Sequence, residues 1–73
     1  MQQKLLTYCS ELINTTTDKN LLKRLKIIKE MLKVPNCFLH LSIDTSINIL
    51  VDLGYSKEEA LNIYKSLTQF KRS

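Results

Sequence analysis

The most reactive side chains in this chain belong to two cysteines and one histidine, Cys9, Cys37 and His40. The cysteines lie far apart and lack zinc-type spacing, so with one histidine a four-ligand metal site would need carboxylates. His40 stands in an apolar run, without a neighbour at a spacing that indicates a catalytic dyad. We therefore expect no catalytic residue, no metal and no cofactor, and we interpret His40 as a partly buried structural histidine.

The acidic residues nearest to a recognisable motif are Glu58 and Glu59, which follow Ser56. Ser56 and Glu59 have the spacing of a capping box, in which each side chain bonds the other residue's backbone N–H. Helix capping and the helix dipole thus explain both glutamates without acid–base catalysis. Because one glycine cannot form a phosphate-binding loop, the sequence does not predict an enzyme.

The strongest periodic pattern lies in residues 20–33, NLLKRLKIIKEMLK. At about 100° per residue on a helix, one narrow apolar stripe is formed by Leu21, Leu25, Ile28 and Leu32. Ile27 and Met31 widen this stripe. The basic residues of this helix gather on the other side and are Lys19, Lys23, Lys26, Lys29 and Lys33. This face is either a solvated surface or an electrostatic surface for an acidic peptide or a phosphate backbone. With three basic residues of the last helix, the candidate partner-binding residues are Lys19, Lys23, Lys26, Lys29, Lys33, Lys65, Lys71 and Arg72.

The length and composition predict one small domain, residues 1–73. The chain is 44% apolar and carries a net charge of +4, which favours an acidic partner or nucleic acid. Nothing resembles a signal peptide, and no apolar run is long enough to span a bilayer. We therefore expect an intracellular protein with reduced cysteines.

The predicted fold is all-α, a small antiparallel bundle of four helices, or five if residues 37–41 count as one. The first helix covers Gln3–Ile13, before a polar break at residues 14–17. The second is capped by Thr17 or Asp18 and ends near Lys33. The third, about residues 45–53, is capped by Ser42 or Asp44 and turns Ile47, Leu50 and Val51 inward; Gly54 ends it and the fourth follows Ser56. The predicted core consists of Leu5, Cys9, Leu12, Leu21, Leu25, Ile28, Leu32, Phe38, Leu41, Ile47, Leu50, Ala60, Ile63, Tyr64 and Leu67.

The segment from about Leu21 to Lys71 resembles the N-terminal helical (LW-type) domain of transcription elongation factor S-II and elongin A. The matching segments are Leu21-Leu22-Lys23-Arg24-Leu25-Lys26, Ser42-Ile43-Asp44, Ile47-Asn48-Ile49-Leu50, Ala60 and Phe70-Lys71. Asp44 stands where the family keeps glycine, and Phe70 replaces its tryptophan. The resemblance implies a non-enzymatic, nuclear protein-interaction module that docks short, partly acidic disordered motifs of transcription proteins.

Two other classes of protein fit parts of the chain. Residues 50–56, followed by Glu59 and Ala60, resemble the corner of ubiquitin-associated-like domains, and residues 50–67 suggest a helix-turn-helix that would bind DNA through Asn62, Lys65, Ser66 and Gln69. The size, charge and residues 60–67 also resemble small bacterial immunity proteins, which would be cytoplasmic. The alternatives to a transcription module are therefore a DNA-binding domain and a bacterial immunity or regulatory protein.

Overall fold

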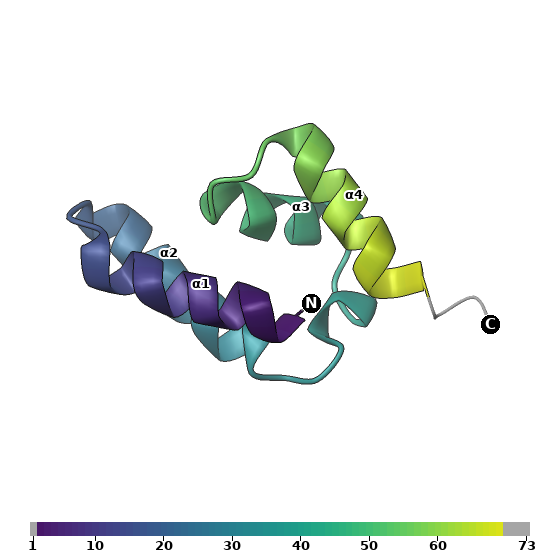
Figure 1. Cartoon of the computed structure of the whole chain (residues 1–73), viewed down its shortest axis with the longest axis horizontal. Helices are drawn as coiled ribbons and strands as arrows, with labels where there is room; N and C mark the ends of the chain where they lie inside the picture. Colours follow the sequence, from purple (N-terminus) through teal and green to yellow (C-terminus); the bar gives the residue numbers. More distant parts are fainter. Residues whose placement is uncertain (1, 70–73) are drawn as a thin grey trace.

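The computed structural model describes residues 2–69, which form an all-α bundle (Figure 1). Its helices are α1 (Gln2–Thr15), α2 (Lys19–Leu32), α3 (Ile43–Asp52) and α4 (Lys57–Thr68), with a short 3₁₀ helix, η1 (Cys37–Leu39), between α2 and α3. The predicted fold class is thus confirmed, and no strand occurs in the described range. Figure 1 shows α1 and α2 side by side as one helical hairpin and α3 and α4 as a second.

Two of the helix starts are each set by one of the two polar caps that the sequence leaves open. The structure selects Asp18 over Thr17 for α2 and Ser42 over Asp44 for α3, so α3 begins at Ile43 and not near residue 45 as predicted. Asp18 caps α2, because its Oδ1 accepts hydrogen bonds from the backbone N–H groups of Asn20 and Leu21 at 2.9 and 3.3 Å. Ser42 caps α3, since its hydroxyl accepts from the N–H of Thr45 at 3.1 Å. Each cap satisfies N–H groups that lack a partner inside the helix.

The corner between α3 and α4 also has the predicted chemistry. Gly54 follows α3 with φ at +107°, a conformation that an L side chain rarely adopts. Ser56 and Glu59 then form the full capping box, with Glu59 N–H donating to Ser56 Oγ at 3.1 Å and Ser56 N–H to Glu59 Oε1 at 3.3 Å. This corner fixes how α4 returns along α3.

The first helix is longer than the sequence predicts. It continues through Thr15, whereas we expected it to end at Ile13 before a polar loop. The hydroxyl of Thr15 donates to the carbonyl oxygen of Glu11 at 3.2 Å, so a residue expected to end the helix instead bonds back onto its preceding turn. At the other end of α1, the Gln2 side-chain amide donates to the carbonyl oxygens of Leu32 and Val34. Carbonyl groups at the end of a helix lack the N–H partner that a following helical turn would supply, and Gln2 provides one from α1.

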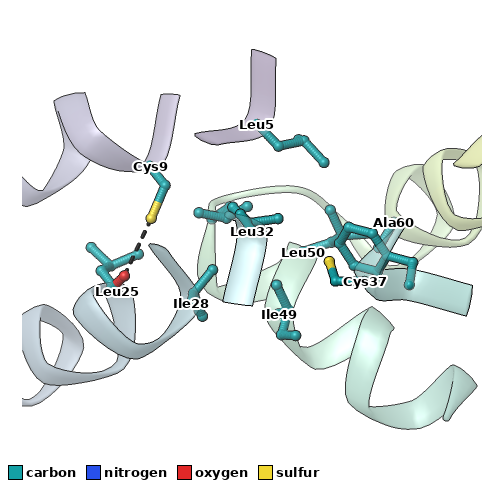
Figure 2. Packing of buried hydrophobic residues seen from close by; sticks show 11 residues of the cluster. Leu5, Cys9, Leu25, Ile28, Leu32, Cys37, Ile49, Leu50 and Ala60 are labelled. Carbon is teal, nitrogen blue, oxygen red and sulfur yellow. Dashed lines mark hydrogen bonds between the residues drawn. The ribbon is translucent and has the colours of Figure 1, made fainter. Parts of the chain in front are cut away.

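One hydrophobic core runs between the two hairpins (Figure 2). The fully buried residues that the sequence predicts are Leu5, Cys9, Leu25, Ile28, Leu32, Phe38, Leu50 and Ala60. The predicted residues that are only partly buried and pack around this cluster are Leu12, Leu21, Leu41, Ile47, Ile63, Tyr64 and Leu67.

The inward face of α3 differs from the prediction. Val51 is 38% exposed, whereas Ile49, Leu53 and the small polar Ser46 are buried beside Leu50. Half of the residues of this helix are apolar and they are spread over more than one side, so its sequence allows more than one inward stripe. The positions that face α4 and α2 decide which stripe is buried, and the prediction for Val51 is wrong.

The segment between the hairpins contributes to the core through η1. Cys37 and Phe38 are buried there, but His40 is exposed, which corrects the interpretation of a partly buried histidine. His40 follows the last residue of η1 and bonds Cys37 only through its backbone, N–H to carbonyl oxygen at 3.0 Å. Its imidazole therefore has no structural role in the core.

Candidate partner-binding surfaces

Helix α2 has one buried and one basic face, as its sequence predicts. Leu25, Ile28 and Leu32 are at most 3% exposed. On the other side, four exposed lysines recur at intervals of three, four and seven residues, and we call them the lysine stripe: Lys19, Lys23, Lys26 and Lys33. At 1.5 Å per residue the stripe extends over about 21 Å, the length of a short extended peptide segment.

Only part of the positive charge in the lysine stripe is neutralised within the protein. The Nζ of Lys33 lies 2.8 Å from a carboxylate oxygen of Glu30, and this hydrogen bond and charge hold the pKa of Glu30 below its usual value. Within residues 2–69, Lys19, Lys23 and Lys26 form no ion pair. These three ammonium groups are the ones available to an acidic partner.

Ile27 lies beside the lysine stripe and not in the core. It is 62% exposed, whereas the sequence interpretation placed it at the margin of the buried stripe. Successive residues lie about 100° apart on a helix, so with Ile28 turned into the core Ile27 must point away from it. The prediction for Ile27 is wrong. Its apolar side chain lies on the surface of α2, one turn from Lys23.

Lys29 does not belong to the exposed basic face. It is half-buried, and its positive charge partly offsets the rise that burial causes in the pKa of Cys9 on α1. On the opposite flank of α2, the Nε of Arg24 lies 3.3 Å from Oδ2 of Asp52 and connects α2 to α3. Both flanks of α2 are therefore occupied by neighbouring helices, which leaves only the middle of its outer face open.

Lys65 stands on α4, on the other hairpin, so the predicted partner-binding residues do not form one surface. Lys71 and Arg72 lie outside the described residues. Lys65 lines an open groove of about 660 Å³ between the start of α3 and the end of α4, which we call the α3–α4 groove. Its lining includes Ile43, Leu61, Tyr64, Lys65, Thr68 and Gln69.

The sequence does not predict the α3–α4 groove, because the groove forms only when α3 and α4 pack together. Ile43 and Leu61 are distant in sequence and meet only once the Gly54 corner has folded. The one available signal was Ile43 itself, an apolar residue directly after the Ser42 cap, where acidic or polar residues are usual. Ile43 is 48% exposed.

The two thiols are not placed for nucleophilic chemistry. Cys9 and Cys37 are free and buried, and burial raises the pKa of both, so they are thiols and not thiolates at neutral pH. Within residues 2–69 no three His, Cys, Asp or Glu side chains group in a way that could hold a metal ion.

Comparisons with family models, with curated proteins and with solved structures found no match for this chain. The resemblance to the S-II and elongin A domain therefore remains a hypothesis. Among the helices of residues 2–69, none has the length and apolar character needed to cross a membrane.

Proposed function

We propose that this protein is a non-enzymatic interaction module whose α2 helix binds a short acidic disordered segment of a partner protein. The observation that carries the proposal is the exposure of Ile27 beside the lysine stripe. An acidic segment lying along α2 would place carboxylates near Lys19, Lys23 and Lys26, and an apolar side chain of the segment would cover Ile27.

The magnitudes indicate a weak and transient complex. An exposed ion pair contributes about 0–1 kcal/mol, and covering one isoleucine contributes at most about 1.5–3 kcal/mol. These gains must also offset the cost of ordering a disordered segment. We therefore expect a dissociation constant of roughly the high-micromolar to millimolar range, with fast association because the basic face attracts the acidic chain.

The resemblance to the S-II and elongin A domain supports a finer version of this proposal. In that version the partner is another protein of transcription elongation and the module acts in the nucleus. The segment resembling the family's second helix includes Lys23 and Lys26, two of the lysines without an ion pair. The residues proposed to bind thus coincide with residues that carry the resemblance.

DNA binding through α4 has less support from the charges. Glu58 and Glu59 are exposed in the first turn of α4, the end that would approach the phosphate backbone in a helix-turn-helix. Their negative charge opposes such an approach. The lysine stripe itself is on a different helix, and over Lys57–Thr68 the two lysines of α4, Lys57 and Lys65, are balanced by Glu58 and Glu59.

The proposal is tested by fluorescence anisotropy with a labelled peptide of aspartate, glutamate and serine that carries one central leucine. The double reversal Lys23→Glu/Lys26→Glu should weaken binding at least about tenfold, because two attractive charges become repulsive. The matched control is Lys4→Glu/Lys57→Glu, which changes the net charge equally at two exposed lysines away from α2. Ile27→Asn should also weaken the binding that persists at higher salt.

Equal binding by the two double variants would reject the lysine stripe as the site. Duplex DNA serves as the competing probe. If DNA bound more tightly than the peptide, with an affinity that fell steeply with salt, the nucleic-acid function would replace the one proposed here.

A further inference from the structure

The α3–α4 groove is a concave surface on the hairpin of α3 and α4, which does not carry the lysine stripe. Ile43, Leu61 and Tyr64 supply the apolar part of its lining. The polar part is supplied by Ser66, Thr68 and Gln69, together with the ammonium group of Lys65. Leu61 and Tyr64 are half-buried, whereas Ile43 and Lys65 are exposed. Among the described residues, the lining thus combines apolar and neutral polar side chains with one positive charge.

Regular backbone holds the groove in shape. Ile43 is the first residue of α3 and follows the Ser42 cap, so the hydrogen bond from Thr45 N–H to Ser42 Oγ fixes where its backbone starts. On α4, the Thr68 hydroxyl already donates to the carbonyl oxygen of Tyr64 at 2.9 Å. A partner therefore meets a preformed surface on two helices, which lowers the ordering cost of binding.

We propose that the α3–α4 groove binds a bulky apolar side chain of a partner protein, with a carboxylate next to that side chain paired to Lys65. The charge decides the chemistry of the occupant. Among the described lining residues Lys65 is the one ionisable side chain besides Tyr64, and it forms no ion pair within residues 2–69. A volume of about 660 Å³ is ample for an aromatic or large aliphatic side chain. The groove is open, so it suits a side chain presented by a polypeptide.

This inference is independent of binding at α2. Lys65 is not a member of the lysine stripe, and neither Ile27 nor Lys23 lines the groove. The two sites can therefore fail separately, and Ile27 on α2 supplies a control variant for the groove.

The test is an amide ¹H–¹⁵N NMR titration of the full chain with acetyl-phenylalanyl-aspartyl amide. We expect shifts concentrated at residues 43, 61, 64, 65 and 68, with a dissociation constant in about the millimolar range because so small a probe makes few contacts. The asparaginyl analogue has nearly the same shape without the charge, and it should bind about threefold more weakly. Shifts centred elsewhere, or none at the solubility limit of the probe, would overturn the proposal.

Two pairs of variants assign the binding to named side chains. Ile43→Asn should abolish the localised shifts, whereas Ile27→Asn, at an exposed isoleucine of α2 that does not line the groove, should leave them unchanged. Lys65→Gln should remove the preference for aspartate over asparagine, whereas Lys57→Gln, at an exposed lysine of the same helix, should keep it. All four positions are exposed, and the spectrum of each variant reports whether it is folded. An unchanged affinity in Ile43→Asn, or an unchanged preference in Lys65→Gln, would contradict the proposal.

Discussion

The thiol of Cys9 donates a hydrogen bond to the backbone carbonyl oxygen of Leu25, with 3.3 Å between sulfur and oxygen (Figure 2). Both residues are fully buried, and the contact joins α1 to α2. Free cysteine in a core acts mainly as a small apolar residue with a weak donor. Cys9 is therefore a packing residue of the first hairpin, and its chemistry is unrelated to the binding surfaces.

Replacing Cys9 should destabilise the protein through lost packing. We expect Cys9→Ala to lower the free energy of unfolding by about 1–2 kcal/mol, since it removes the buried sulfur and its contact to Leu25. Ser10→Ala is the matched control, because Ser10 is half-buried on the same helix and its hydroxyl bonds only the preceding turn at Leu6. Urea unfolding measures both, and equal losses would show that Cys9 is not a core residue.

We expect the two cysteines to react slowly with thiol reagents in the folded protein. We also expect their ionisation to lower the free energy of unfolding at alkaline pH. Burial raises the pKa of Cys9 and Cys37, so the folded protein holds both protons at a pH where the unfolded chain loses them. Stability from this source is complete below the unfolded pKa, about 8.5, and is lost as pH rises through the raised folded values. Ellman's reagent at pH 8 should label the native protein at least about tenfold more slowly than the protein in urea. Equal rates would contradict the burial of the thiols.

We expect the capping box to stabilise the protein although Ser56 and Glu59 are exposed. Ser56→Ala removes the acceptor for the Glu59 N–H at the start of α4 and should cost about 1 kcal/mol. Ser66→Ala, at an exposed position inside the same helix, should be neutral or slightly stabilising because alanine is the better helix former. Thermal unfolding of both variants checks the difference. A loss of stability in Ser66→Ala as large as in Ser56→Ala would argue against the cap.

The sequence predicts the helices well because local chemistry sets where they begin and end. Asp18, Ser42, Ser56 and Gly54 act at the positions where they occur, whatever the tertiary fold. The prediction failed at Thr15, where a side-chain hydroxyl bonded back into the helix it was expected to end. Local rules therefore locate the helices, but α1 ends after the predicted residue and α3 begins before it.

The sequence predicts the binding surfaces less well because their apolar parts depend on how the hairpins pack. The lysine stripe follows from spacing alone, but the exposure of Ile27 depends on which neighbouring isoleucine enters the core. Ile43 and Leu61 meet only after the chain turns at Gly54. Charge patterns on one helix are thus readable from the sequence, whereas a groove between two helices is not.

The most direct test compares the thermal unfolding of two variants of the protein, each with one substitution in α2. One substitution is on the face of α2 that packs in the core, and the other is on the face proposed to bind the partner. Leu25→Ala should cost about 2–5 kcal/mol and unfold much of so small a domain, because Leu25 is fully buried. Ile27→Ala should change the stability by no more than about 0.5 kcal/mol, because Ile27 is 62% exposed. A nearly unchanged melting temperature in Leu25→Ala, or a large loss in Ile27→Ala, would show that the opposite face of α2 is buried.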